Sequence, residues 1–330
     1  MKSFRFILLL ILHLNACFCS AQQNECVEIK FDENPGNLSA CVFAPYFKKD
    51  SAVKKPLVIA LHGCSQNQTS FARESGWNKL AADNDFVILY PSQKRLNNMS
   101  NCFNWFKSKD ITKNSGELQS IVSMIDKVVE TYNIDTSRIY VYGVSAGAAM
   151  SVCLLAVYPS YFQSGAILAG APYGIAESSL EATLAMTKTV DKSPKEWAEL
   201  IPKDSLIQKY PNLIVCHGTK DKIVNIKNSY ELIEQWAYIH QIDTIPDDIV
   251  INYSANCVKK FIYKDTNNFE KIIFYKISNL GHAIPVNPGE EKLQGGTTGL
   301  FSKDIDFFST YFIAEDFGII RNNETISDKK

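Results

Sequence analysis

The pentapeptide Gly143-Val144-Ser145-Ala146-Gly147 constrains the fold of this chain more than any other feature of its sequence. A β-branched and aromatic run precedes it at residues 138–142, and an alanine-rich run follows it. Gly-x-Ser-x-Gly between a strand and a helix is typical of a nucleophile elbow, a strained turn that presents the serine above a helix N-terminus. Because five residues can match by chance, the strand and helix around them give the motif its weight. The sequence predicts that Ser145 is a nucleophile.

Segments with strand and helix character alternate on both sides of this turn. Residues 56–61 form a continuous apolar run, residues 70–82 have helical spacing, and residues 86–90 are again strand-like. Such alternation predicts a mostly parallel, doubly wound sheet with helices on both faces, as in the α/β-hydrolase fold. Further strands are expected at 166–169, 212–216, 250–252, 260–263 and 272–275, and helices at 117–132, 228–238 and 303–312.

Two regions depart from this alternation. Strand-like residues 26–31 and 38–44 flank a turn at 34–37, which predicts an antiparallel edge at the start of the sheet. A polar stretch with helical pieces, residues 177–209, is expected to be an insertion that can cap a site. A single α/β domain often reaches this length, so we expect one domain over residues 22–320.

The N-terminus has the pattern of an export signal. A basic segment precedes a short apolar run at residues 6–14, which is too short to span a bilayer. We expect cleavage of residues 1–21 as a signal peptide and a secreted or periplasmic protein. A lipid anchor on Cys17 is the alternative, although Asn15 fits such a site poorly. Residues 321–330 are predicted to be a polar tail.

The composition excludes several classes of partner. The chain has 34 basic and 35 acidic residues, without the basic excess that nucleic-acid or anionic-membrane binding requires. No later segment is expected to span a membrane.

Of nine cysteines, Cys17 and Cys19 lie in the signal, and the odd remainder leaves at least one free thiol. No Cys-x-x-Cys pair remains and no histidine lies at ligand spacing, so we expect neither a metal nor a cofactor.

A nucleophilic serine needs a base, which follows the acid in the chain order of this fold. Among the five histidines, His13 lies in the signal and His62 precedes the serine. His217 lies at a strand end close to the best acid, and His240 ends a helix. His282 lies in a glycine-containing loop after a strand, from which its imidazole can turn toward the serine. We therefore predict that His282 is the base.

The predicted acid is Asp221, which lies just past the strand at 212–216 and between the serine and His282. Its carboxylate would accept the Nδ1 proton of His282, fix the tautomer and stabilise the imidazolium. Other acids lie in the insertion, as Asp191 does, or precede a strand, as Asp247 does. An ordinary turn aspartate is the alternative for Asp221.

A tetrahedral oxyanion needs two backbone donors, one of them from the residue after the nucleophile, here Ala146. The second is expected from the loop after the strand at 56–61, and Cys64 N–H is the candidate. His62 is expected to brace this loop by hydrogen bonding rather than to act in catalysis. The Cys64 side chain is not expected to be a nucleophile, because the serine already has that role.

With these residues placed, the chain resembles the esterase family of extracellular polyhydroxybutyrate (PHB) depolymerases and related feruloyl and acetylxylan esterases. The likeness spans residues 34–319 and rests on several blocks in matching order. These blocks are 34–38, 61–66, 89–93, 102–106, 116–117 with 120–121, 143–147, 169–174, 217–218 with Asp221, and 281–283.

The resemblance implies further roles and also has exceptions. It implies a disulfide between Cys64 and Cys102 beside the oxyanion loop, and a place for Trp105 in the substrate cleft, although core packing is equally open for Trp105. The family often has a tryptophan two residues after the catalytic histidine, and at that position we expect Ile284 to line the substrate cleft of this chain. It also tends to have a cysteine where residues 294–296 now stand. The absence of the tryptophan concerns the grip on a polymer, and the absence of the cysteine can explain an unpaired thiol.

The leading functional hypothesis is hydrolysis of an ester, such as a poly- or oligo-(3-hydroxyalkanoate), through a Ser145 acyl-enzyme. The alternative is a feruloyl or acetylxylan esterase, which shares the catalytic parts and differs in the cleft. A non-catalytic binding protein on the same fold is a further alternative, but such proteins usually lose a triad member, and here all three positions are filled. The expected partner is an ester substrate and not a nucleic acid.

Overall fold

The computed structural model describes residues 26–46, 52–203 and 209–320. Its strands are β1 (Val27–Glu28), β2 (Ser39–Phe43), β3 (Lys55–Leu61), β4 (Val87–Ser92), β5 (Ile134–Val144), β6 (Ser164–Leu168), β7 (Asn212–Gly218), β8 (Asp248–Ile251), β9 (Val258–Lys264), β10 (Glu270–Ile277), β11 (Ile284–Val286) and β12 (Ser302–Asp304). Its helices are α2 (Gln68–Ser75), α3 (Trp77–Asn84), α4 (Ser108–Ile111), α5 (Gly116–Tyr132), α6 (Ala146–Val157), the 3-10 turn η1 (Pro159–Tyr161), α7 (Ser179–Thr187), α8 (Pro194–Glu199), α9 (Lys227–His240) and α10 (Ser309–Asp316).

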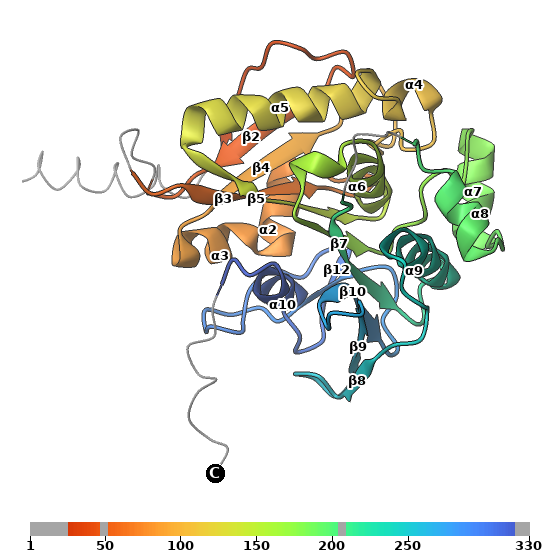
Figure 1. Cartoon of the computed structure of the whole chain (residues 1–330). Helices are drawn as coiled ribbons and strands as arrows, with labels where there is room; N and C mark the ends of the chain where they lie inside the picture. The colour runs from red at the N-terminus through yellow and green to blue at the C-terminus, as the bar shows by residue number, and fades with distance from the viewer. Residues whose placement is uncertain (1–25, 47–51, 204–208, 321–330) are drawn as a thin grey trace, which may run out of the picture.

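Within the described residues, ten strands form one sheet in the order β1-β2-β4-β3-β5-β6-β7-β10-β9-β8 (Figure 1). The strands from β4 to β10 in this order pair in parallel. Antiparallel strands complete both edges, β1 and β2 on one side and β9 and β8 on the other. The expected α/β-hydrolase type of sheet with an antiparallel N-terminal edge is confirmed, and the parallel strands have their carboxyl ends at one edge.

The two faces of the sheet have separate cores because alternate strand residues point in opposite directions. In β3, Leu57 and Ile59 join the core beneath α5, α6 and α9, whereas Val58 and Ala60 join the core beneath α2, α3 and α10. Every residue of β3 is buried, which explains the uninterrupted apolar run at residues 56–61. Helices therefore cover both faces, as the alternating sequence pattern predicts.

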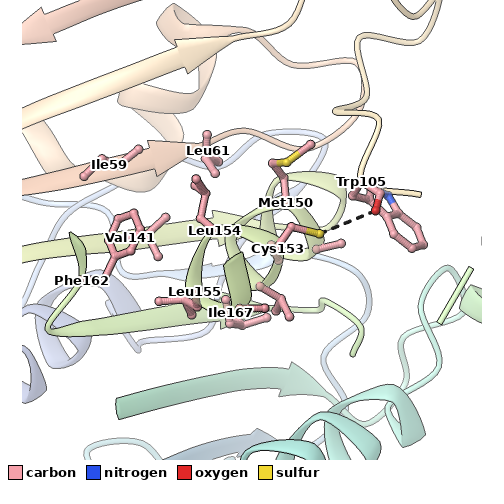
Figure 2. Packing of buried hydrophobic residues seen from close by; sticks show 14 of the residues in the cluster. Ile59, Leu61, Trp105, Val141, Met150, Cys153, Leu154, Leu155, Phe162 and Ile167 are labelled. Atoms are coloured by element: carbon pink, nitrogen blue, oxygen red, sulfur yellow. Dashed lines mark hydrogen bonds between the residues drawn. The ribbon is translucent and has the colours of Figure 1, made fainter. Parts of the chain in front are cut away.

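Helix α6 lies in the middle of the first core. All of its residues from Ala146 to Val157 are buried. Figure 2 shows its side chains Met150 and Leu154 beside Leu61 of β3. Because small alanines at its start allow close approach to the sheet, the helix is fixed directly behind the turn that carries Ser145. The packing thus sets the position of the candidate nucleophile.

Two predicted helices have different boundaries in the structure. The segment at 70–82 is two helices, because Gly76 adopts φ 74° and ends α2 before α3 begins. The prediction of a helix over 303–312 is wrong at its start, where β12 pairs with β11 before α10 begins at Ser309. The buried aromatic residues of this stretch are Phe307 and Phe308, which lie between β12 and α10, and Tyr311 and Phe312 of α10.

The structure describes only part of the regions for which a signal peptide, an insertion and a polar tail are predicted. The signal peptide at 1–21 and the tail at 321–330 lie outside the described residues. Within the described part of 177–209, the helical pieces are α7 and α8. Across the described ranges, no helix is both long and apolar enough to cross a membrane.

Candidate active site

Ser145 lies between the end of β5 and the start of α6, in a strained backbone conformation with φ 55° and ψ −119°. Its N–H donates to Leu168 O at 2.9 Å, which ties the turn to the neighbouring strand β6. The side chain is partly exposed, while the residues before and after it are buried. The chain therefore presents one polar group from an otherwise buried turn.

The two glycines of the motif are required by close backbone contacts. A β-carbon on Gly143 would overlap the carbonyl group of Gly147. A β-carbon on Gly147 would overlap the carbonyl oxygens of Leu61 and His62 at the end of β3. The helix start thus crosses the backbone of a neighbouring strand at a distance that only glycine allows.

His282 and Asp221 are hydrogen-bonded to each other. His282 Nδ1 lies 2.7 Å from Asp221 Oδ2, and the two side chains are 6% and 0% exposed. Because a carboxylate only accepts, Nδ1 carries the proton, and in the neutral imidazole Nε2 is the basic nitrogen. The other oxygen of Asp221 accepts the N–H groups of Ile223 and Val224 at 2.8 and 2.9 Å.

The environment of Asp221 keeps its carboxyl group ionised. Burial disfavours the charged form, but hydrogen bonds from His217 and His282 outweigh that effect and lower the pKa of Asp221 well below its usual range. A permanently charged carboxylate at this place favours positive charge on the imidazole of His282. This is the electrostatic setting that a general base requires when it takes up a proton.

Ser145, Asp221 and His282 follow three parallel strands, β5, β7 and β10, and so lie at the same edge of the sheet. The structure joins two of these three side chains by a hydrogen bond, Asp221 and His282. Among the described residues, the Ser145 hydroxyl has no hydrogen-bond partner. Serine–histidine contacts are often loose without substrate.

The loop after β3 carries the candidate oxyanion donor. Gly63 N–H donates to Gln66 Oε1 at 2.9 Å, Ser65 N–H to Ser100 O at 2.7 Å, and Gln66 N–H to Gly63 O at 3.3 Å. Within the described residues, Cys64 N–H is therefore the backbone donor of 63–66 that has no partner. A β-carbon on Gly63 would lie 3.5 Å from Ser145 Cβ, so the loop is adjacent to the candidate nucleophile.

Ala146 supplies a second backbone N–H beside the serine. It is the first residue of α6, and the first N–H groups of a helix have no acceptor within the helix. These groups also carry the positive end of the helix dipole. Ala146 and Cys64 thus come from two different segments, the start of α6 and the loop after β3.

His62 braces the oxyanion loop, as predicted. Its side chain is fully buried, with Nδ1 2.7 Å from Gly63 O and Nε2 accepting the Gln93 N–H at 3.1 Å. Burial lowers the pKa of His62 to about 4, although the bond to the Gly63 carbonyl opposes this shift. A neutral imidazole with both nitrogens occupied by backbone groups holds the loop and is not available as a base.

A disulfide joins Cys64 to Cys102, so the pairing implied by the family resemblance is present. A second disulfide joins Cys26 to Cys41 at the antiparallel edge. Three cysteines in the described residues remain free, in agreement with the odd number expected: Cys153, Cys216 and Cys257.

The two predicted cleft residues are buried. Trp105 is only 7% exposed, and its carbonyl oxygen accepts the Cys153 thiol at 3.7 Å (Figure 2), so the structure favours the core-packing role. The prediction that Ile284 lines the cleft is wrong, because its side chain is 0% exposed and packs in the core beneath α10. Strand β11 begins at Ile284 and turns this side chain inward, away from solvent.

Sequence reasoning noted that His217 is close to the acid but did not predict that it bonds to Asp221. His217 Nε2 lies 3.0 Å from Val224 O and 3.3 Å from Asp221 Oδ2, and Nδ1 lies 2.6 Å from Ser229 Oγ. Its spacing of four residues from Asp221 in the block at 217–221 is the signal that could have identified it. The Phe301 ring also packs edge-on against the His282 ring, with 6.0 Å between the ring centroids. No feature of the sequence indicates this contact.

A strained elbow serine, a buried acid–histidine pair and unpaired backbone donors at the carboxyl edge of a parallel sheet define the α/β-hydrolase class. Within the described residues, no cluster of histidine, cysteine and acidic side chains is suited to hold a metal ion. The chain belongs to the family Esterase PHB depolymerase, which matches residues 41–245. It is thus an esterase of the group that includes PHB depolymerases and feruloyl and acetylxylan esterases.

Relatives within this group are similar over most of the chain. Poly(3-hydroxyalkanoate) depolymerase C of Paucimonas lemoignei is 37% identical over 299 residues, which cover 88% of this chain and 69% of that protein. Feruloyl esterase B of Talaromyces funiculosus is 27% identical over 266 residues, 78% of this chain and 72% of that protein. The fold matches acetyl xylan esterase from Aspergillus awamori with a TM-score of 0.70, 23% identity, and coverage of 78% and 94%.

Proposed function

We propose that the protein hydrolyses esters through a covalent acyl-enzyme on Ser145. His282 Nε2 removes the hydroxyl proton as Ser145 Oγ bonds to the ester carbonyl carbon, and Asp221 stabilises the imidazolium. The N–H groups of Cys64 and Ala146 bind the oxyanion. The observation that carries this proposal is the Asp221–His282 hydrogen bond, because it leaves Nε2 as the basic nitrogen at the edge where Ser145 lies.

The tetrahedral intermediate then breaks down. The bond to the alkoxy group breaks, His282 gives its proton to the leaving alcohol, and the acyl group remains on Ser145. A water molecule loses a proton to His282 and attacks the acyl carbon through a second oxyanion intermediate. Release of the acid returns the proton to Ser145, so the cycle consumes one water and leaves the protein unchanged.

We infer that the substrate is a poly- or oligo-(3-hydroxyalkanoate). Support comes from the higher identity to the Paucimonas lemoignei depolymerase, 37% against 27% for feruloyl esterase B of Talaromyces funiculosus. A feruloyl or acetylxylan esterase is the second candidate, supported by the coverage of those relatives. Ile284 stands where the family often has a tryptophan, and its side chain is buried. This position therefore provides no aromatic contact to a polymer.

We also infer that the protein is exported. Two disulfides in the described residues support this, because such bonds persist in oxidising compartments and are rare in the cytosol. The basic and apolar N-terminal pattern of residues 1–21 is the expected signal.

The test of the chemistry is Ser145→Ala compared with Ser137→Ala, an exposed serine near the other end of the same strand. With a short-chain p-nitrophenyl ester, Ser145→Ala is expected to lower kcat by about 10⁴-fold or more. Ser137→Ala should match the wild type. Hydrolysis by Ser145→Ala at the wild-type rate contradicts the proposal. If the wild-type protein does not hydrolyse the ester, the result supports a binding protein.

The test of the substrate compares two assays on the same wild-type preparation. Clearing of PHB granules without ferulate release from feruloylated arabinoxylan supports the depolymerase. Ferulate release without clearing supports the second candidate. Ser145→Ala in both assays shows whether either activity belongs to this site.

A further inference from the structure

The oxyanion loop, residues 62–66, is held on one side by a buried glutamine and a buried glutamate. Gln66 accepts the Gly63 N–H through Oε1 at 2.9 Å and donates through Nε2 to Glu74 Oε2 at 2.7 Å. Gln66 is 4% exposed and Glu74 is 7% exposed. The carboxylate fixes the orientation of the amide, because it can only accept and so must face the amide NH₂ group.

A second glutamine and glutamate hold the other side of the loop. Gln93 donates through Nε2 to Glu117 Oε1 at 2.6 Å, and its backbone N–H donates to His62 Nε2 at 3.1 Å. Gln93 Nε2 also donates to the carbonyl oxygen of Cys102, the disulfide partner of Cys64, at 3.2 Å. Glu117 thus connects to the loop both through His62 and through the disulfide.

All the side-chain and backbone groups that bond to Glu117 are donors. Asn104 N–H bonds to Oε2 at 2.8 Å, and Asn104 Nδ2 bonds to Oε1 at 2.6 Å, in addition to Gln93 Nε2. An ionised carboxylate matches this set, whereas a glutamine at this position would turn an NH₂ group toward at least one donor. An isosteric substitution therefore breaks the network and leaves the packing volume unchanged.

The arrangement has a consequence for the candidate oxyanion donor. Gln66 occupies the Gly63 N–H, and Ser100 occupies the Ser65 N–H, so within the described residues the Cys64 N–H is left without a partner in a loop adjacent to Ser145. Small displacements of an oxyanion donor strongly reduce transition-state stabilisation, because the hydrogen bond must match a preorganised geometry. Each glutamate is connected to this loop through one glutamine: Glu74 through Gln66, and Glu117 through Gln93.

We propose that Glu74 and Glu117 are positioning residues for the reaction, which hold the Cys64 N–H in its oxyanion-binding orientation through Gln66 and Gln93. The inference rests on the proposed function, because it assigns these residues to the transition state of that reaction. Neither glutamate contacts the substrate. Their removal is expected to weaken binding of the oxyanion and to leave binding of the ground-state ester unchanged.

The experiment compares Glu74→Gln and Glu117→Gln with Glu130→Gln, a control on α5 whose side chain is 72% exposed. Three quantities are measured with a p-nitrophenyl ester and a trifluoromethyl ketone: kcat, KM, and the inhibition constant. The ketone forms a hemiketal with a nucleophilic serine and so reports on oxyanion binding. We expect kcat to fall by about 10- to 100-fold in both variants, with KM within about twofold of the wild type.

The inhibition constant of the ketone is expected to rise by the same factor by which kcat/KM falls. A purely structural role predicts instead a lower folded fraction, with unchanged kcat per titrated active site. If a glutamate variant fails to fold, Gln66→Met tests the same relay, because it removes the acceptor of the Gly63 N–H and leaves Glu74 in place. Unchanged kcat and ketone affinity in folded variants overturn the inference.

The outcome is separable from the test of the proposed function. If Ser145→Ala is inactive and the folded glutamate variants behave as Glu130→Gln does, only the positioning role fails. If Ser145→Ala keeps wild-type activity, the proposed function fails, whatever the glutamate variants do.

Discussion

The two halves of the candidate site are held in different ways. On the serine side, backbone overlaps require glycine at 143 and 147, and a disulfide fixes the neighbouring loop at Cys64. On the histidine side, the backbone of Leu280 also passes close to Gly218 of β7, but a β-carbon on Gly281, directly before His282, would meet no heavy atom within 4 Å. His282 itself is held by its hydrogen bond to Asp221 and by the edge of the Phe301 ring.

The difference matches the chemistry expected of each half. A nucleophile and oxyanion donors act by holding fixed dipoles in place, so rigidity on the serine side favours the transition state. A base must take a proton from the serine and then give it to the leaving group, so open space at the residue before His282 is compatible with its role. Substitutions on the two sides should therefore have different effects, and the following three tests compare them.

The largest effect is expected for Asp221→Asn. The amide would keep an oxygen for the N–H groups of Ile223 and Val224 but would turn its NH₂ group toward His282 Nδ1. The histidine would then adopt the other tautomer, with the proton on Nε2, and could not act as a base. We expect kcat to fall by about 10⁴-fold, as in the corresponding substitution of a serine protease triad. A loss of less than tenfold in steady-state hydrolysis would show that the acid lies elsewhere.

The next effect distinguishes the two sides directly. Gly147→Ala is expected to lower activity by about 100-fold or to prevent folding, because its β-carbon would overlap the carbonyl oxygens of Leu61 and His62. Gly281→Ala should change the free energy of unfolding by no more than about 1 kcal/mol, because open space surrounds it. Chemical denaturation and ester hydrolysis measure both quantities. Equal losses in the two variants would contradict the difference in packing.

The smallest effect concerns the two disulfides. Removal of the Cys64–Cys102 bond, which closes 38 residues, is expected to cost about 4 kcal/mol of unfolding free energy and to lower kcat about tenfold. Removal of the Cys26–Cys41 bond, which closes 15 residues, should cost about 3 kcal/mol without a change in kcat. Serine double variants and denaturant unfolding provide the measurement. A drop in kcat in both pairs would show that stability alone governs activity.

The sequence predicted the serine side of the site more fully than the histidine side. The elbow is local, so five residues with a strand before them and a helix after them were sufficient to place Ser145 and Ala146. The pairing of Cys64 with Cys102 is implied by the family resemblance alone. The acid and histidine had to be chosen by chain order, because strands β7 and β10 become neighbours only through the sheet topology.

The parts that sequence reasoning missed depend on tertiary contacts. Ile284 was placed in the cleft by its spacing from His282, but β11 pairs with β12 and turns it into the core. The glutamine–glutamate relays join residues up to 24 positions apart, between Gln93 and Glu117, and no local pattern indicates which buried glutamine faces which carboxylate. Gly76 divides a continuous helical pattern, because it adopts a left-handed φ at a place where a β-carbon would overlap Gly296 N and the Phe308 ring.

The most direct test of the account is covalent labelling of the wild-type protein with a fluorophosphonate, followed by proteolysis and mass spectrometry. We expect one phosphonyl group per folded molecule, on the peptide that contains Ser145, formed in step with the loss of ester hydrolysis. Asp221→Asn should label much more slowly, because its histidine cannot take up the serine proton. Labelling of another residue, or hydrolysis that continues after complete labelling of Ser145, would contradict the assignment of Ser145 as the nucleophile.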